Sequence, residues 1–232
     1  MIYVTGDTHG SHDFGKLRRF AAKHPHLTKE DYLIVSGDFG GVWYEKTLDE
    51  DLKPYEALPF TVLFVDGNHE NFDLLNSFPV ETWHGGKIHR IRPHILHLMR
   101  GQIFEIEGKT FFTFGGGTSI DKYMRREGVS WWRQEVPSYA EFDEAVTNLS
   151  RCGHRVNYVI THSCDEKSLY TPLLSTVSKS MTVYPDNVML MEFERTIEYD
   201  HWYFGHYHLD GYVSDRKTAL YQDIVQIGTE ET

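Results

Sequence analysis

Short apolar runs rich in β-branched and aromatic residues recur along the chain, and their spacing limits the folds that it can adopt. The apolar character within each run is mostly continuous rather than alternating, which is typical of strands buried on both faces. Amphipathic stretches of helical length separate several of them, and this alternation predicts an α/β fold with a mainly parallel sheet. The runs are IYVT (2–5), YLIVS (32–36), TVLFV (61–65), NYVIT (157–161) and WYF (202–204).

Two of the intervening stretches carry helical signals. Residues 11–24 place apolar side chains at helical spacing. Residues 138–151 begin with Ser138, which Glu141 follows three positions later, and this pair predicts a capping box. We therefore expect a helix over each range.

Residues 80–115 follow a different pattern, with apolar runs joined by short glycine-containing links. The runs ILHLM (95–99), QIFEIE (102–107) and TFFTF (110–114) predict antiparallel meander or hairpin structure, and the C-terminal stretch GYVSD, TALYQDI and VQIG has the same character. We expect two packed mixed β-sheets flanked by helices, in a four-layer α/β architecture. No repeat or linker divides the 232 residues, so one domain over 1–232 is expected, with a specificity region around 80–135.

Composition excludes several classes of protein. Lys and Arg number 23 and Asp and Glu number 34, and the net charge of −11 disfavours binding of long nucleic acids through their phosphates. No apolar run approaches the roughly 20 residues of a membrane-spanning helix. The N-terminus lacks signal-peptide features, and Cys152 and Cys164 make no disulfide framework, so we expect a cytoplasmic protein with reduced thiols. The 14 histidines point to metal or acid–base chemistry.

Polar residues with metal-binding capacity follow each of the five buried runs. The carboxyl ends of parallel strands lie on one edge of a sheet, where ligands bind, so residues far apart in sequence can converge there. A single Asp after a strand usually caps a turn, and a single His is usually solvated, but the same character at five strand ends favours a shared site. The residues are Asp7, His9, Asp38, Asn68, His162, His206 and His208.

These residues offer two carboxylates, one amide oxygen and four imidazoles. That donor set is too large for one tetrahedral ion and suits two ions if one carboxylate bridges them. Mixed nitrogen and oxygen ligands favour Mn, Fe, Zn or Ni, whereas Mg or Ca would prefer oxygen alone. We expect two divalent ions, with Mn²⁺ as the first candidate.

The order GDTHG, GD, GNHE, a strand-ending His and GHYH resembles the calcineurin-like metallophosphoesterase superfamily, and the motifs extend from Asp7 to His208. The resemblance implies a pair of mixed β-sheets flanked by helices. It implies a first metal ion held by Asp7, His9, Asp38 and His208. It implies a second ion held by Asp38, Asn68, His162 and His206, with Asp38 bridging the two. In such a centre a hydroxide held between the ions would attack phosphorus in line.

His69 stands next to Asn68 but outside the ligand set, and the resemblance implies that it protonates the leaving oxygen or stabilises the transition state. The second motif departs from the GD-x-x-D-R-G pattern of protein Ser/Thr phosphatases, because Gly41 and Val42 replace its Asp and Arg. The carboxylate that partners the catalytic His in that branch is therefore missing or replaced. This departure disfavours a protein phosphatase, and the second His of GHYH is typical of phosphodiesterase and nuclease-like branches.

Three other features each allow two interpretations, and a fourth is a candidate cover for the site. Arg125 or Arg126 either binds the substrate phosphate or belongs to a solvated charge cluster. The run GGGTS (115–119) either brings N–H groups to a phosphate or forms a turn. Trp131 and Trp132 either stack on a base or anchor a loop to the core. Residues 165–190 are loop-like and are a candidate cover for the site.

The combined prediction is a dinuclear metal-dependent hydrolase of phosphate esters. A small phosphodiester or nucleotide is the leading substrate, and the alternative is a phosphomonoester of a small molecule or phosphoprotein. A membrane partner is not expected. The competing class is a non-catalytic scaffold of the same fold, and the presence of all the expected ligands and His69 argues against it.

Overall fold

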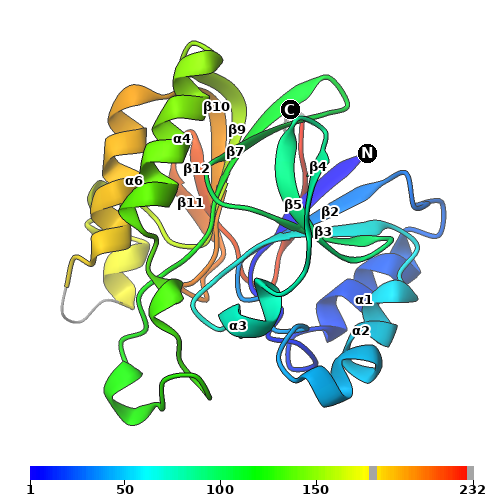
Figure 1. The fold of residues 1–232 in the computed structure, drawn as a ribbon. Helices are drawn as coiled ribbons and strands as arrows, with labels where there is room; N and C mark the ends of the chain where they lie inside the picture. Colours follow the sequence, from blue (N-terminus) through cyan, green and yellow to red (C-terminus); the bar gives the residue numbers. More distant parts are fainter. Residues whose placement is uncertain (178–181, 229–232) are drawn as a thin grey trace.

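Two mixed β-sheets stack face to face, with helices on both outer faces, in the computed structural model, which describes residues 1–177 and 182–228 (Figure 1). In Figure 1, α1 and α2 lie against one sheet, and α4 and α6 lie against the other. The seven-stranded sheet has the order β13-β1-β2-β3-β6-β5-β4, and the six-stranded sheet has the order β11-β12-β10-β9-β8-β7. The predicted fold of two packed mixed sheets is confirmed.

The elements have the following bounds. The strands of the larger sheet are β1 (Ile2–Thr5), β2 (Tyr32–Ser36), β3 (Thr61–Val65), β4 (Val80–Trp83), β5 (Gly86–Arg92), β6 (Ile95–Leu98) and β13 (Ile224–Gln226). Those of the smaller sheet are β7 (Gln102–Ile106), β8 (Lys109–Phe114), β9 (Arg155–Thr161), β10 (Glu198–Phe204), β11 (Gly211–Ser214) and β12 (Lys217–Ala219). The α-helices are α1 (Gly15–Lys23), α2 (Leu48–Glu56), α3 (Phe72–Leu75), α4 (Tyr139–Arg151), α5 (Glu166–Leu169) and α6 (Pro185–Thr196). The 3₁₀ turns are η1 (Glu45–Thr47), η2 (Lys122–Met124), η3 (Arg133–Glu135) and η4 (Leu174–Thr176).

The continuous apolar runs belong to strands that pack on both faces. Along β2, Leu33 and Val35 pack in the cluster that contains α1 and α2, whereas Ile34 packs between the two sheets. Along β8, Phe111 lies between the sheets and Phe112 packs beneath α4 and α6. Three apolar clusters therefore fill the three spaces between four layers.

The predicted meander or hairpin structure over 80–115 is correct for hairpins and wrong for a continuous meander. β7 and β8 form an antiparallel hairpin and β5 pairs antiparallel with β6, but β6 pairs in parallel with β3. The link at Arg100 and Gly101 therefore carries the chain from one sheet to the other. At the C-terminus β11 and β12 are antiparallel, whereas β13 pairs with β1 in the other sheet. A glycine-containing link predicts a turn. It does not predict which strand the following strand pairs with, because packing between distant segments determines the pairing.

The helix predictions differ in accuracy. The capping box at α4 is present, since Ser138 Oγ accepts from Glu141 N at 3.3 Å and the Glu141 carboxylate accepts from Ser138 N at 2.7 Å. Helix α1 begins at Gly15 rather than at residue 11, because the preceding residues form turns, with the N–H of Asp13 donating to the carbonyl of Thr8. None of the helices in the described ranges is long and apolar enough to cross a membrane.

Candidate metal centre

The carboxyl ends of five strands bring the predicted ligands together. Three of these strands, β1, β2 and β3, belong to the larger sheet, and β9 and β10 belong to the smaller one. The site therefore lies where the ends of two stacked sheets meet, and not along one sheet. The predicted ligands and the residues that precede them are contributed by the loops that begin at Gly6, Gly37, Asp66, His162 and Gly205.

Glycines permit this convergence at two points. A Cβ on Gly67 would collide with the carboxylate of Asp38, and a Cβ on Gly205 would collide with the carboxylate of Asp7. Each glycine therefore lets the backbone of one loop pass against a carboxylate of another.

Four predicted ligands adopt a backbone conformation that L-residues rarely take. The φ angles of His9, Asp38, His206 and His208 are 44°, 48°, 69° and 52°, all in the left-handed region. For residues other than glycine this conformation costs about 1–2 kcal/mol each. Such strain is concentrated at functional sites, where the surrounding structure holds it in place.

Each of the seven predicted ligands lies close to at least one of the others. Two groups of three have candidate ligand atoms within 4.8 Å: Asp7 with His9 and His208, and Asp7 with Asp38 and His162. His208 Nε2 lies 3.1 Å from Asp7 Oδ2, and His9 Nε2 lies 3.3 Å from Asp38 Oδ2.

The other ligands complete the cluster around His162. Its Nε2 lies 3.0 Å from Asn68 Oδ1, 3.4 Å from Asp38 Oδ1 and 3.2 Å from His206 Nδ1. Asp38 therefore contacts both His9 and His162, which places it between the two halves of the cluster. This central position is the one expected of a bridging carboxylate.

Hydrogen bonds at the far side of two imidazoles fix which nitrogen faces the cluster. His9 Nδ1 lies 2.8 Å from Asp13 Oδ2, and His162 Nδ1 lies 3.0 Å from the carbonyl of Ser36. Because both partners only accept, each Nδ1 carries the proton, and neutral imidazole then presents an Nε2 lone pair to the cluster. This arrangement is typical of histidines that bind metals.

A buried chain of hydrogen bonds orients the amide of Asn68. Asn68 Nδ2 donates to Ser119 Oγ at 3.0 Å, and Ser119 Oγ donates to Glu135 Oε2 at 2.6 Å. The N–H of Ser119 also donates to Glu135 Oε1 at 2.9 Å. The chain fixes Nδ2 toward Ser119, so Oδ1 faces His162 and the cluster.

The directions of the pKa shifts in the cluster are also those expected of a site that binds cations. Burial alone would raise the pKa of Asp38, but the charge of His162 and a hydrogen bond from His9 outweigh it, and the pKa is well below its usual range. Burial alone would lower the pKa of His9, yet the hydrogen bond to Asp38 and its charge raise it to about 9. Without a metal, protons on imidazoles thus balance the buried carboxylates, and metal ions would replace those protons.

One buried oxygen remains without a hydrogen bond. Asp7 Oδ2 makes no hydrogen bond within the described residues, although Asp7 is fully buried, and its contact is the ion pair with His208 Nε2 at 3.1 Å. A buried carboxylate oxygen is costly unless it is hydrogen-bonded, paired with a positive charge or bound to a metal. This oxygen, the exposed lone pairs of the imidazoles and the mixed donor set together fit divalent metal ions.

The partner of His69 is an arginine. Nη1 of Arg125 lies 3.0 Å from His69 Nδ1, and Arg125 also holds both carboxylate oxygens of Asp121 at 2.8 Å. A guanidinium only donates, and Nη2 of Arg125 also lies 3.5 Å from His69 Nε2, but the shorter contact is the one to Nδ1. Nδ1 is therefore assigned as the acceptor, with the proton of the neutral imidazole on Nε2. Burial lowers the pKa of His69, and the charge of Arg125 lowers it further. The side chain of Arg126 is exposed and lines neither of the two cavities described below.

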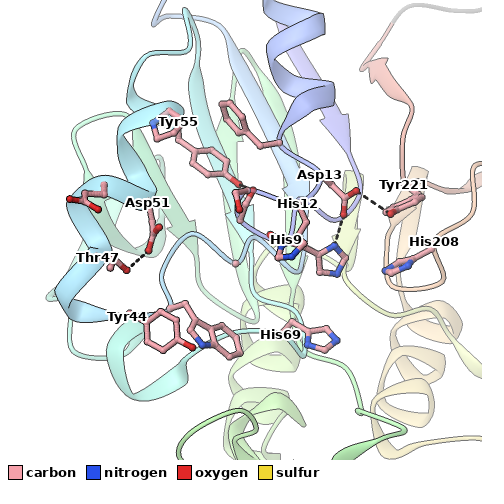
Figure 2. Close-up of a pocket in the computed structure, with 17 residues that line it drawn as sticks. His9, His12, Asp13, Tyr44, Thr47, Asp51, Tyr55, His69, His208 and Tyr221 are labelled. Carbon is pink, nitrogen blue, oxygen red and sulfur yellow. Dashed lines mark hydrogen bonds and ion pairs between the residues drawn. The ribbon is translucent and has the colours of Figure 1, made fainter.

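Within the described part of the chain, two of the cavities adjoin the cluster and contain His69 and His208 in their walls. One, of about 640 Å³, is here named the arginine cavity, and its walls include Asn68, Ser119 and Arg125. The other, of about 830 Å³, is shown in Figure 2 and is named the aromatic cavity, with Phe14, Trp43, Tyr44 and Tyr55 in its walls.

Two of the remaining sequence interpretations can be compared with the structure. Gly116 and Gly117 donate their N–H groups to the carbonyls of Asp66 and Glu135, so these amides are not available for a phosphate. Trp132 is buried and its indole N–H donates to Asp73 at 2.7 Å, as expected of an anchor.

The stretch 165–190 is not simply a loop. It contains α5, η4 and the start of α6, and residues 178–181 lie outside the described residues. Thr182 and Tyr184 line the arginine cavity, and the proposal that this stretch covers the site stays a prediction.

The sequence analysis did not identify the residues whose hydrogen bonds hold the ligand-bearing loops and side chains in place. Glu70 accepts from the N–H groups of Phe39 and Gly40, and Lys16 donates to the carbonyls of Gly6 and Asp7. A signal existed for Glu70, which lies within the GNHE motif, and for Asp13, which follows His9 by four positions. Ser119 and Glu135 had no such signal, because only tertiary packing brings them to Asn68.

The sequence matches the calcineurin-like phosphoesterase family over residues 1–210, so the chain belongs to this family and is a metal-dependent phosphoester hydrolase. No curated protein gives a significant sequence match.

Among solved structures, two similar ones are a protein of unknown function from Aquifex aeolicus and a phosphopantetheinyl hydrolase from Mycobacterium tuberculosis. The first is 16% identical over 83% of this chain and 92% of the other, with a TM-score of 0.37. The second is 16% identical over 95% of this chain and 87% of the other, with a TM-score of 0.42.

Proposed function

We propose that the protein hydrolyses a small phosphodiester, with two divalent metal ions at the cluster. The observation that carries the proposal is the position of the cluster between two cavities that share His69 and His208. A diester has two organic groups on one phosphorus, and two cavities can accept one group each. A monoester would need only one of them.

The ligand assignment is part of the proposal. Asp7, His9, Asp38 and His208 would hold one ion, and Asp38, Asn68, His162 and His206 would hold the other. Mn²⁺ is the first candidate, and Fe, Zn or Ni remain alternatives. When bound, the two ions supply Lewis acidity that neutralises charge on the phosphate and makes water a better nucleophile.

The chain's own residues move the proton and position the substrate. His69 holds a proton on Nε2, because Nδ1 accepts from Arg125, and His69 donates it to the leaving oxygen. Arg125 is fixed by Asp121 and presents its positive charge at the wall of the arginine cavity, where it attracts the phosphate.

The test is hydrolysis of bis-p-nitrophenyl phosphate and of p-nitrophenyl phosphate, each with Mn²⁺ and with a chelator control. We expect chelator-sensitive cleavage of the diester with a higher kcat/KM than for the monoester. Cleavage of the monoester alone would make the protein a phosphatase. Failure to cleave either ester, with no metal bound, would instead support the scaffold class and contradict the ligand assignment.

A further inference from the structure

We infer that the aromatic cavity binds one organic group of the substrate, and that this group is planar and either uncharged or cationic. The inference rests on the proposed phosphodiesterase function and specifies the class of diester. The argument uses the size of the cavity, its aromatic walls and its charge.

The aromatic cavity is too large for a phosphate group alone. Its volume of about 830 Å³ lies within the roughly 300–1,000 Å³ that small-molecule sites usually have. In Figure 2, His208 and Tyr221 lie on one side of the view and Thr47 and Asp51 on the opposite side, with His9 between them. A group attached to a phosphate at the cluster would therefore extend toward α2.

Two aromatic side chains of the cavity, Trp43 and Tyr44, are positioned to contact a flat ligand. Trp43 packs perpendicular to buried Trp132, with ring centroids 5.5 Å apart, and its carbonyl accepts from Asn71 Nδ2 at 2.7 Å. Tyr44 is 62% exposed, so its ring lacks the protein contacts that a buried aromatic would have. A half-buried indole in a fixed orientation beside an exposed phenol offers a stacking surface for a planar group.

Hydrogen bonds further limit the cavity's polar chemistry. The hydroxyl of Tyr55 already donates to the carbonyl of Gly10 at 2.9 Å, so this ring serves as a wall. Asp51 Oδ2 accepts from Thr47 Oγ1 at 2.6 Å, so one carboxylate oxygen of Asp51 is already hydrogen-bonded within the protein.

The charge of the cavity opposes an anionic group. Among the described residues that line it, Asp13, Glu50 and Asp51 are acidic and none is Lys or Arg. Lys46 and Lys53 belong to the same segment but do not line the cavity. Among the described residues that line the two cavities, Arg125 is the one Lys or Arg, and it lies in the arginine cavity. A second phosphate or a carboxylate in the aromatic cavity would be repelled, which disfavours nucleoside triphosphates and polynucleotides.

The experiment measures binding of four methyl phosphodiesters by isothermal titration calorimetry to the Mn²⁺-loaded His69→Asn protein, in which slow turnover leaves the esters intact, and the variants below are made in that background. Their second groups are methyl, phenyl, 3-(trimethylammonio)phenyl and 3-carboxyphenyl. Because the first group is always methyl, a single aryl group is free to enter the cavity that it prefers. The three aryl groups differ mainly in charge.

We expect the phenyl and ammonium ligands to bind at least about tenfold more tightly than the carboxyphenyl ligand. Trp43→Ala is expected to weaken phenyl binding about tenfold and dimethyl phosphate binding less than twofold. The matched control is Trp83→Ala, a half-buried tryptophan on β4 that lines neither cavity, and it should change neither affinity.

A separate variant and control test whether the acidic side chains of the cavity repel the anionic ligand. The double variant Glu50→Gln/Asp51→Asn should reduce the penalty for the carboxyphenyl ligand to about threefold or less. Glu45→Gln, which removes an exposed carboxylate on η1 outside the cavity wall, should leave the penalty unchanged.

Two outcomes would overturn the inference: equal affinity for the three aryl ligands, or equal weakening of all four by Trp43→Ala. The turnover assay on bis-p-nitrophenyl phosphate separately tests the proposed function. Failure of that assay, with Trp43-dependent binding retained, would reject the phosphodiesterase and leave the aryl site in place.

Discussion

Replacing Ser119 by Ala tests whether the orientation of Asn68 controls metal binding. The substitution removes the hydroxyl that accepts from Asn68 Nδ2 and donates to Glu135. Without it, the amide of Asn68 can rotate and direct its NH₂ group toward His162. Loss of a residue that orients a metal ligand typically lowers metal affinity by about 10–100-fold, or about 1.4–2.7 kcal/mol.

The same substitution should also lower stability by a calculable amount. Asn68, Ser119 and Glu135 are 6%, 3% and 0% exposed, so the groups left without partners are not solvated. A buried polar group without a partner costs about 1–3 kcal/mol, and we expect the free energy of unfolding to fall by about 2 kcal/mol. For a chain of this length that corresponds to a decrease in Tm of about 4–8 °C.

A matched control separates the two effects. Ser168 Oγ donates to buried Asp165 at 2.5 Å, so Ser168→Ala also removes a buried hydroxyl from a carboxylate, but it touches no proposed ligand. Mn²⁺ titration calorimetry and metal analysis after dialysis should show weakened binding of one ion in the Ser119 variant only. Equal metal affinity in the two variants, with similar decreases in Tm, would refute the assignment of Asn68 as an oriented ligand.

Three further predictions address the proton donor, the arginine and a buried histidine. His69→Asn should lower kcat by about 10²–10⁴-fold while metal content stays normal, and a parallel loss of metal would contradict the proposed role. Arg125→Ala should raise KM for the diester at least about tenfold, with exposed Arg126→Ala as the control; an unchanged KM in both would remove Arg125 from the substrate site. His89 is buried beside His97, and burial followed by the charge of His97 lowers its pKa to about 4. The unfolded chain therefore binds more protons between pH 6.5 and 4, and stability should fall by up to about 3 kcal/mol as pH decreases through that window. Urea titrations at pH 7 and 4.5 should show a smaller decrease for His89→Gln; an equal decrease would exclude His89 as the cause.

Much of the fold could be predicted because it depends on local patterns. Continuous apolar runs such as 61–65 identified strands buried on both faces, and Ser138 with Glu141 identified the start of α4. The pairing of β6 with β3 and of β13 with β1 could not be predicted, since a run of apolar residues fits either a hairpin or a parallel strand. The choice depends on which faces become buried in the finished core.

The sequence by itself also determined the inventory of the site: carboxylates, an amide and imidazoles placed after strands, beside glycines that allow close approach. Chain direction places the carboxyl ends of β1, β2 and β3 at one edge of the larger sheet and those of β9 and β10 at one edge of the smaller sheet, and the stacking of the two sheets brings these edges together. The tertiary structure alone decided what surrounds them. It placed Arg125 on His69 where Gly41 leaves no carboxylate, linked Asn68 to Glu135 through Ser119, and arranged two cavities beside the cluster. These contacts join segments far apart in the chain, and hydrogen bonds across such distances leave no periodicity in the sequence from which they can be predicted.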